Sequence, residues 1–464
     1  MTPSQDPQTK KDGLLTRVWR SIFRGPLLPR DDRDRKWLVF NTLVLHLRPL
    51  KVPAGTIRYT HTFGLGGMSL VLIMMLMGTG ILLMFVYEPS PDAAYDSLVG
   101  FQQQVLFGKL VRTVHYWSAN LVIVVMVLHL LRVFFTGGFH GPRQFNWIVG
   151  LFLLLCVLGS NFTGYLLPWD QLSYWAVTIV TGMVEYVPAV GGWLQRVIRG
   201  GAEIGTSTVI NFYTLHTTVL PVLLIGLMAL HFWRVRKAGG VVDPAPGGNA
   251  GEQGRERVLF LPELLMRETA VALALVALVL VVAIGLGAPL GERANAGMSP
   301  DPAKAPWYFL GFQELLFHFH PFFAVVVIPL LAAIALAMVP YLRYDGEISG
   351  PWFLTEKGKR MGTVAALAGL VVTPLWLVLD ELVIDAARWF PGLPAALRDG
   401  LIPFGILLAA IAVFHLALKR RFAATRNESV QALFILLAVA FAVLTVTGVW
   451  FRGTGMALTW PWNL

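Results

Sequence analysis

Nine apolar stretches, each close to the length that crosses a lipid bilayer, constrain this chain most. A transmembrane helix needs about 20 mainly apolar residues. The stretches cover residues 64–87, 113–134, 147–167, 211–233, 269–288, 321–341, 362–380, 401–418 and 431–451. Charged residues make up only 14% of the 464 residues, too few to cover a soluble fold of this size. The sequence therefore predicts an all-α membrane protein in contact with membrane lipid.

Lysine and arginine are divided unevenly between the two sets of connecting segments. If the N-terminus is cytoplasmic, nine of the 37 basic residues lie outside and the other 28 lie inside. The nine are Lys109, Arg112, Arg196, Arg199, Arg293, Lys304, Arg388, Arg398 and Arg452. Because basic loops stay in the cytoplasm, we expect a bacterial inner-membrane protein with a cytoplasmic N-terminus and an outer C-terminus. Topology thus explains the net charge of +10, and we expect no nucleic-acid partner.

Two of the stretches each carry a pair of histidines. His115 and His129 are 14 residues apart, and His216 and His231 are 15 apart. Since four helical turns take 14.4 residues, about 22 Å of helix, each helix presents two imidazoles on nearly one face. Both helices cross the membrane in the same direction, so His115 should meet His216 near the outer surface and His129 should meet His231 near the inner one.

Paired imidazoles at two levels indicate haem more than other cofactors. Bis-histidine ligation suits electron transfer, because it leaves no open position on the iron. Zinc is a weaker interpretation, since two histidines fill half of a tetrahedral site. A lone membrane histidine that bonds a carbonyl is the common alternative, but it does not explain matched pairs. The only cysteine, Cys156, excludes a cysteine-ligated cluster in this chain.

Glycines with the same period support two haems. Gly66 and Gly80 are 14 residues apart in the first stretch, as Gly150 and Gly164 are in the third. Glycine lets a macrocycle approach the backbone, although small residues also serve ordinary helix packing. Two arginines lie three residues outside the histidines of the second stretch, where they are expected to pair with haem propionates or to reach the interface. They are Arg112 and Arg132.

Four segments resemble the cytochrome b subunit of quinol-oxidising bc complexes, most closely the cytochrome b6 type. They read LVRTVHYWSAN, HLLRVFFTGGF, GYLLPWDQLSYWAVTIVTG and HTTVLPVLLIGLMALHF. The resemblance to cytochrome b6 covers residues 37–240, and residues 257–380 look like a divergent subunit IV. It implies that His115 and His216 ligate the low-potential haem, and that His129 and His231 ligate the high-potential haem.

The resemblance also implies two quinone sites. The outer one is built from the loop after Gly164 and from a motif that reads Pro-Glu-Trp-Tyr in the family and Ala305–Tyr308 here. Its expected residues are Trp169, Asp170, Tyr174, Ala176, Pro306, Trp307 and Tyr308. For the inner site, Arg236 matches the family's basic residue, with positive-inside anchoring as the alternative. Glu263 is a candidate proton carrier there, or a solvated carboxylate at a helix start.

The implied function is quinol oxidation at the outer site, with electrons sent partly across the membrane to quinone at the inner site, the Q cycle. The Rieske iron–sulfur protein and c-type cytochrome must be separate chains, and family members form dimeric complexes. Two alternatives are a dihaem membrane anchor of another quinone-linked oxidoreductase and a secondary transporter. The anchor leaves the two loop motifs unexplained, and the transporter leaves the histidine pairs unexplained.

The expected organisation has five parts. These are an N-terminal interfacial segment (1–60), a dihaem four-helix bundle (61–237), a linker (238–256), subunit IV-like helices with the outer-site loop (257–380), and two extra transmembrane helices (381–464). In the first part, residues 13–24 alternate apolar and basic as in a helix on a membrane surface, or they form a solvated tail. Both haems should be non-covalent, because Gly64 replaces the cysteine that tethers an additional haem in cytochrome b6.

The outer site needs a proton acceptor, because Pro306 stands where the family's motif has glutamate. An efficient acceptor has a pKa near the working pH, which favours histidine or a carboxylate whose pKa is raised by burial. Glu314 is the first candidate, since a carboxylate within GFQELLF is costly unless it is functional or hydrogen-bonded, for example to a loop amide. Asp170 and His318 are the alternatives.

Overall fold

The computed structural model describes residues 13–22, 31, 51–244, 256–259 and 263–463. Within these ranges nine helical segments are long and apolar enough to span a membrane, which confirms the predicted all-α membrane fold. They are Leu65–Met84, Gly108–Phe135, Gly141–Leu166, Thr206–Lys237, Leu265–Leu286, Phe323–Tyr341, Glu356–Leu382, Ala396–Phe422 and Arg426–Trp450. The second span begins at Gly108, five residues before its apolar stretch, because Lys109 and Arg112 belong to its first turns.

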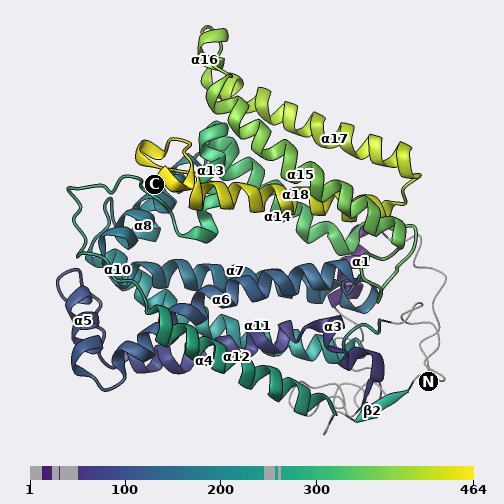
Figure 1. Ribbon diagram of the computed structural model, residues 1–464, viewed down its shortest axis with the longest axis horizontal. Coiled ribbons are helices and arrows are strands. Elements are labelled where there is room, and N and C mark those ends of the chain that lie inside the picture. The colour runs from purple at the N-terminus through teal and green to yellow at the C-terminus, as the bar shows by residue number, and fades with distance from the viewer. Residues whose placement is uncertain (1–12, 23–30, 32–50, 245–255, 260–262, 464) are drawn as a thin grey trace.

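The first five spans form one group in Figure 1. Its helices are α4 (Leu65–Met84), α6 (Gly108–Phe135), α7 (Gln144–Leu166), α10 (Thr206–Thr214) continued by α11 (Leu220–Lys237), and α12 (Leu265–Leu286). Helix α4 packs along α6, α7 packs along α11, and α12 covers α6 and α4. Fully buried Leu72, Val122 and Val279 join α4, α6 and α12 in one core.

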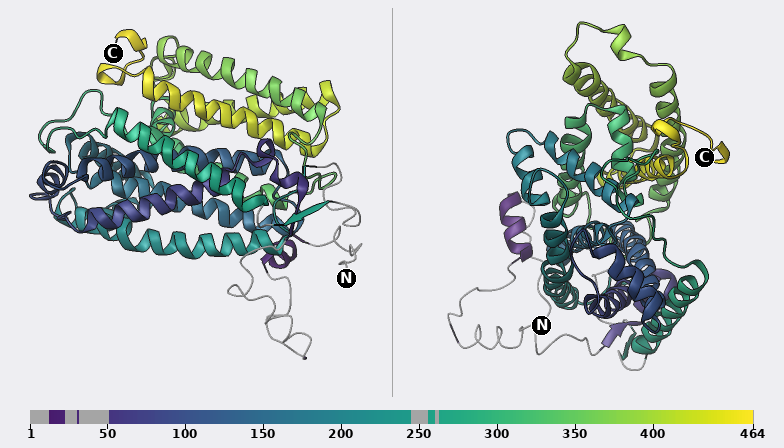
Figure 2. Two further views of the ribbon diagram at one scale, coloured as in Figure 1. Left: turned by 60° about the horizontal axis from the view of Figure 1, so that its bottom comes forward. Right: turned by 90° about the vertical axis from the view of Figure 1, so that its left-hand side faces the viewer.

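The last four spans form a second group, above the first in Figure 1 and in both views of Figure 2. Its helices are α13 (Leu310–His318), α14 (Ile328–Met338), α15 (Glu356–Leu382), α16 (Ala386–Trp389), α17 (Ile402–Phe422) and α18 (Arg426–Trp450). Helix α18 packs along α15 and also along α13. The rings of Phe134 and Phe434 stack 3.9 Å apart, and Gln144 Nε2 donates to Pro340 O at 2.9 Å. These contacts join the two groups.

The two ends of the helices differ in what connects them. One end carries residues 85–107, 167–205 and 287–322, and we call it the loop end; it is at the left of Figure 1. The opposite end carries the segments to which most of the lysines and arginines were assigned above, and we call it the basic end. Three short helices and a 3-10 turn lie at the loop end: α5 (Ala94–Gln104), α8 (Gln171–Met183), α9 (Gly191–Arg199) and η7 (Trp307–Phe309). The described C-terminal residues also lie there, near α13 (Figure 1).

Three helices that run from the loop end contain a π-turn. The turns are η5 (Leu215–Val219), η8 (Phe323–Val327) and η10 (Ala396–Leu401). Each is followed two residues later by a proline, Pro221, Pro329 or Pro403. Proline has no N–H and its ring collides with the carbonyl four residues earlier, so a wider turn with one extra residue relieves the contact. The prolines therefore explain all three turns.

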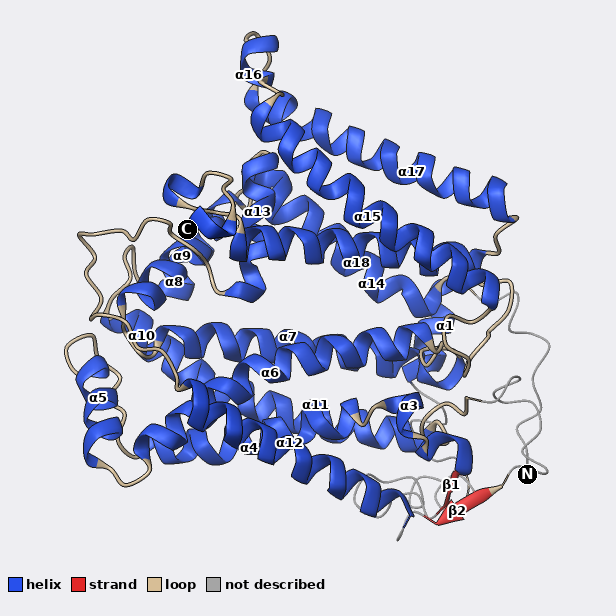
Figure 3. Ribbon diagram, viewed as in Figure 1, coloured by secondary structure: helices blue, strands red, loops and turns tan. Residues whose placement is uncertain are grey.

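At the basic end, a short helix and a small ribbon support the bundle. Helix α1 (Leu14–Ile22) confirms the predicted N-terminal helix, and Arg17 Nη1 donates to Tyr341 O at 2.8 Å. Its Leu15 and Trp19 remain exposed. The strands β1 (Lys51–Pro53) and β2 (Arg257–Leu259) pair antiparallel and lie below α3 (Tyr59–Thr62) in Figure 3. The predicted linker falls largely outside the described residues.

Candidate functional site

The four predicted histidines meet in two pairs inside the first group of helices. The ring centroids of His115 and His216 are 6.1 Å apart, with an angle of 69° between the planes. Those of His129 and His231 are 6.5 Å apart, at 74°. The first pair lies toward the loop end and the second toward the basic end. The structure thus brings together the residues that the sequence pattern paired.

Each of the four predicted glycines faces one of these histidines. A Cβ atom on Gly66 would lie 3.3 Å from His129 Cε1, and one on Gly80 would lie 3.4 Å from His115 Cε1. On the other helix pair, the distances are 3.7 Å from Gly150 to His231 Cε1 and 2.5 Å from Gly164 to His216 Cε1. The glycines of α4 serve the histidines of α6, and those of α7 serve the histidines of the η5–α11 segment. They therefore provide space for the imidazole rings.

The π-turn η5 explains the unequal histidine spacing. It contains His216 and precedes Pro221. A π-turn takes one more residue than an α-turn. Fifteen residues from His216 to His231 therefore cover nearly the same four turns as the 14 residues between His115 and His129. The second helix keeps its histidines level with those of the first.

The geometry of the pairs fits a group ligated by two imidazoles. Metal–imidazole bonds of about 2.0 Å, with the ring nitrogen about 1.1 Å from the ring centroid, place two axial rings roughly 6.2 Å apart. The observed 6.1 and 6.5 Å agree with that value. His216 Nδ1 is hydrogen-bonded to Ser160 O at 2.8 Å, and His115 Nδ1 lies 2.9 Å from Thr79 Oγ1. Such bonds fix the ring orientation and leave Nε2 as the free ligand atom.

The two arginines that flank the histidines of α6 are both buried. Arg112 donates to Gln102 Oε1 and to the carbonyl oxygens of Ala288 and Pro289. Arg132 Nε donates to His61 O at 3.0 Å, while its Nη2 has no hydrogen-bond partner within the described part of the chain. A buried guanidinium nitrogen without a partner fits an anionic group at this level. Arg112 ties α6 to the residues that follow α12, and its pairing with a haem propionate stays a prediction.

The loop after Gly164 is held in place by Asp170. This residue caps helix α8, where its Oδ1 accepts from Ser173 N at 2.9 Å. Its Oδ2 accepts from Gly291 N at 3.0 Å. Both oxygens are therefore engaged by backbone amides, an arrangement that anchors the loop. The rings of Trp169 and Tyr174 contact each other edge to face at 5.5 Å, and Ala176 is fully buried on α8.

The second motif forms the 3-10 turn η7 directly before α13. Pro306 caps the turn, and Trp307 Nε1 donates to Asn120 Oδ1 at 2.7 Å. Tyr308 is buried, its hydroxyl has no partner among the described residues, and burial raises the pKa of that hydroxyl. An unpaired buried hydroxyl of this kind is suited to bond a ligand.

Glu314 does not have the environment that the sequence led us to expect. Burial would raise the pKa of its carboxyl group, but hydrogen bonds with His318 and Arg452 outweigh burial and hold that pKa below its usual value. The prediction of a raised pKa is therefore wrong. Arg452 Nε lies 3.1 Å from both carboxylate oxygens, so the partner is a guanidinium, and no loop amide of the described residues bonds Glu314. In His318, burial lowers the pKa, but bonds to Asp380 and Glu314 raise it above the usual value.

The residues predicted for the inner quinone site lie on or next to two different helices. Arg236 is on α11, and its Nη1 is buried without a partner in the described structure. Glu263 is exposed next to α12, and its Oε2 lies 3.9 Å from Arg267 Nη2. Helix α12 packs mainly on α6 and α4. Glu263 has the partly solvated setting of a helix-start carboxylate.

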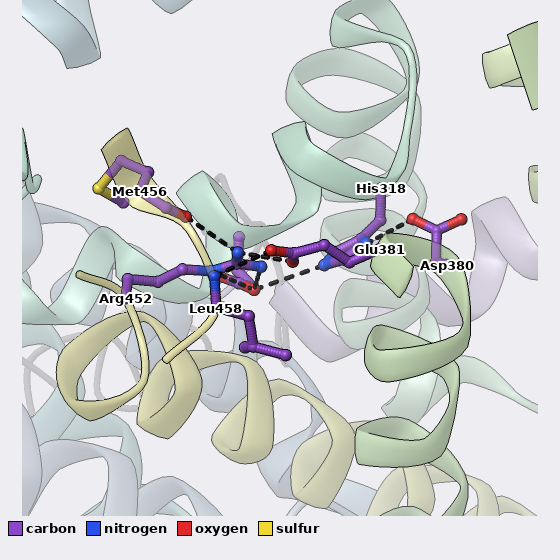
Figure 4. Close-up of polar contacts among 7 residues, drawn as sticks. His318, Asp380, Glu381, Arg452, Met456 and Leu458 are labelled. Carbon is purple, nitrogen blue, oxygen red and sulfur yellow. Dashed lines mark hydrogen bonds and ion pairs between the residues drawn. The ribbon is translucent and has the colours of Figure 1, made fainter. Parts of the chain in front are cut away.

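Sequence reasoning missed three charged residues next to Glu314 and His318. They are Asp380 and Glu381 at the end of α15, and Arg452 just after α18. Arg452 Nη1 donates to Glu381 Oε2 at 2.6 Å and to Met456 O at 3.0 Å (Figure 4). A signal existed, because charges at the ends of apolar stretches require partners when they are buried. Two acidic residues ending one stretch and an arginine ending another are such a signal.

Comparisons with known proteins agree with the paired-histidine geometry. The family described as Cytochrome b/b6/petB matches residues 51–239. Cytochrome b6 of Chlamydomonas reinhardtii is 42% identical over 175 residues, which are 38% of this chain and 81% of that protein. Cytochrome b6 of Acaryochloris marina is 44% identical over a stretch of the same length and coverage.

A solved structure extends the similarity to nearly the whole fold. The chain is similar to a structure titled "Hyperthermophilic respiratory Complex III", with a TM-score of 0.63 and 20% identity, over 90% of this chain and 96% of that one. At this identity the match concerns the fold alone. The extent of the b6 matches, together with the family match over all four histidines, establishes that this chain belongs to the cytochrome b/b6 family.

Proposed function

We propose that this chain is the dihaem cytochrome b subunit of a bc-type complex, which oxidises quinol at the loop end and reduces quinone at the basic end. The observation that carries the proposal is the pair of histidine levels, each with its facing glycines and with centroid distances of 6.1 and 6.5 Å. His115 and His216 hold one b-type haem, and His129 and His231 hold the other. When bound, the haems supply one-electron carriers across the membrane.

The chain's own residues perform the binding and positioning. The Nδ1 contacts to Ser160 O and Thr79 Oγ1 keep His216 and His115 turned toward the ligand. Arg132 offers its free Nη2 to a propionate at the basic end. The protein thereby places the cofactors, and the cofactors supply the redox chemistry.

At the loop end, quinol binds between the loop after Gly164 and the turn η7. Asp170 and Trp307 fix the two walls through their hydrogen bonds. The Tyr308 hydroxyl donates to a quinol or quinone oxygen, which satisfies its buried donor. At the basic end, Arg236 is the cation nearest to the quinone in this proposal, and its Nη1 has a vacant donor.

The complex requires further chains. A Rieske iron–sulfur protein and a c-type cytochrome accept the electron that does not cross the membrane, since this chain has one cysteine and cannot bind a cysteine-ligated cluster. We propose that the five sequence-defined parts act together in this complex, that the complex is a homodimer in the bacterial inner membrane, and that its loop end faces outward.

A haem determination on the purified chain tests the proposal. The pyridine haemochrome assay should give two b haems per chain, and the complex should reduce an artificial acceptor with decyl-benzoquinol. The variant His115→Ala should abolish quinol oxidation while the haem at the His129–His231 level remains. A purified folded chain without b haem would refute the proposed function.

A further inference from the structure

A buried group of charged side chains at the loop end has no part in haem or quinone binding as described above. It contains Glu314 and His318 from α13, Asp380 and Glu381 from the end of α15, and Arg452, the second residue after α18. We call these five residues the α13 charge cluster. Figure 4 shows His318 pointing toward Asp380, and Arg452 reaching Glu381.

The cluster connects a fully buried carboxylate to a partly exposed one. His318 Nε2 lies 3.4 Å from Glu314 Oε1, and His318 Nδ1 lies 2.7 Å from Asp380 Oδ2. The side chains of Glu314 and His318 are 1% and 2% exposed, whereas that of Asp380 is 20% exposed. Imidazole can bind a proton at one nitrogen and release one from the other. This arrangement can therefore carry a proton from Glu314 in the interior to Asp380 at the surface.

The charge balance favours one bound proton. Three carboxylates and one guanidinium give a charge of −2 while His318 is neutral. Lys304 in the loop before η7 is close enough to interact electrostatically with Glu314, and its Nζ donates to Val449 O at 3.0 Å. With Lys304 included, the charge is −1, and a proton on His318 brings it to zero. Since an uncompensated buried charge is costly, the cluster takes up a proton readily, in agreement with the raised pKa of His318.

The cluster is rigidly connected to the proposed quinol site. Helix α13 continues directly from η7, which contains Trp307 and Tyr308. Gln313, the neighbour of Glu314, accepts from Ala305 N at 2.7 Å and donates to Ala303 O at 3.0 Å. From Tyr308 to Glu314 the helix rises about 9 Å, a distance that a chain of one or two waters can span.

We propose that Glu314, His318 and Asp380 form a proton exit path for the loop-end site, and that Arg452 is the positioning residue that keeps Glu314 in place. This inference rests on the proposed function. Each quinol oxidised to quinone gives up two electrons and two protons. The electrons leave to an iron–sulfur cluster on a partner chain and to haem. One proton passes to the Glu314–His318 pair and leaves through Asp380 to water, so the path returns to its starting state. The second proton passes directly to water at the loop end.

The experiment compares carboxylate and imidazole variants with matched controls in the purified complex. The path variants are Glu314→Gln, His318→Asn and Asp380→Asn. Glu88→Gln is the carboxylate control, because Glu88 is exposed at the same end. His320→Asn is the imidazole control, two residues beyond His318. The rate of decyl-benzoquinol oxidation is measured from pH 5 to 9, roughly the range around the usual histidine pKa, and haem content is measured in parallel.

We expect a slower rate of quinol oxidation in the path variants and a shift in its pH dependence. The path variants should oxidise quinol about 100-fold more slowly, at the lower end of the range for proton transfer by a positioned side chain, with haem content unchanged. In the wild type the rate should rise with pH as His318 loses its proton, around a pKa above its usual value. Because Glu314 and Asp380 raise that pKa, neutralising either one should move the rise to lower pH. His318→Asn should remove it.

Other outcomes overturn the path. Rates and pH profiles equal to those of Glu88→Gln and His320→Asn would refute it, and so would a slower rate with an unmoved pH profile, which indicates a structural role. If the complex with Glu314→Gln does not assemble, the result for Asp380→Asn supports or refutes the path. This variant should assemble, because the Asp380 side chain is partly exposed and asparagine keeps an oxygen that can bond His318. Wild-type complex that does not oxidise quinol would overturn the proposed function itself, which separates the two failures.

Discussion

Replacing Gly164 with alanine is expected to disturb the histidine level at the loop end. The new Cβ would lie 2.5 Å from His216 Cε1 and 2.8 Å from His216 Nδ1, about 1 Å closer than the 3.5–4.0 Å of a favourable carbon contact. His216 must therefore move, and its Nδ1 bond to Ser160 O is lost or stretched. The ring then no longer presents Nε2 at the same place.

The size of the effect follows from three contributions. Overpacking costs about 1–3 kcal/mol, and the lost hydrogen bond costs about 0.5–1.5 kcal/mol. Alanine is preferred over glycine in a helix by about 1 kcal/mol, which offsets part of the cost. The net loss of about 0.5–3.5 kcal/mol corresponds to roughly 2- to 400-fold weaker retention of the group that His216 binds.

Gly150→Ala is the matched control on the same helix. Its Cβ would meet His231 Cε1 at 3.7 Å, an ordinary contact, so the helix preference of alanine should dominate. Gly226→Ala on α11 is a second control, since nothing lies within 4 Å of that Cβ in the described structure. The assay is the ratio of b haem to protein, with a redox difference spectrum that separates the two haems.

We expect Gly164→Ala to lose haem at the His115–His216 level and both controls to keep it. A normal haem ratio and normal spectrum in Gly164→Ala would show that His216 adjusts without cost, and the contact argument would then fail. Loss of the haem at the His129–His231 level in Gly150→Ala would show that a bound macrocycle, and not the imidazole ring, sets the space at these glycines.

Three further predictions use the same preparations. His129→Ala or His231→Ala should remove the haem at the basic end and leave the other partly occupied, measured by the difference spectrum; loss of both haems from a folded chain would contradict independent levels. No haem-stained band should survive denaturing electrophoresis, because Gly64, which precedes α4 with φ +67°, offers no thiol for a thioether bond. Arg452→Met should destabilise the protein by about 3–5 kcal/mol, since it leaves the buried Glu314 charge unpaired. Denaturant unfolding should show part of that loss recovered in the double variant Arg452→Met/Glu314→Gln. If the unfolding free-energy changes of the two single variants simply add in the double variant, the ion pair is not supported.

The helices and the histidine pairs could be predicted because their signals are local and periodic. Nine apolar stretches fix nine spans, and spacings of 14 and 15 residues place His115, His129, His216 and His231 on helix faces. The π-turn at His216 was not predicted, although Pro221 contains its cause. Helical periodicity alone treats spacings of 14 and 15 residues as nearly equal. The π-turn shows why the histidines of both helices nevertheless lie at the same two levels.

The α13 charge cluster could not be predicted because its members are far apart in the sequence. Arg452 and Glu314 are separated by 138 residues, and no periodic pattern relates them. The sequence assigned Arg452 to the outer loops, where it counted as one of nine basic residues. In the structure its side chain is 1% exposed, so it is a buried counter-charge and not a topological signal.

The position of Arg452 also changes how the last two spans are understood. The expected boundary between the subunit IV-like helices and the extra helices falls after residue 380, but Asp380 and Glu381 on either side of it both belong to the cluster. Helix α18 packs along α13 and α15 and delivers Arg452 to Glu314. A carboxylate at Glu314 is tolerated in the interior because this helix supplies its partner. Of the two extra spans, α18 is therefore tied to the helix that follows the Trp307–Tyr308 turn, and the residue that follows it closely supplies the counter-charge for Glu314.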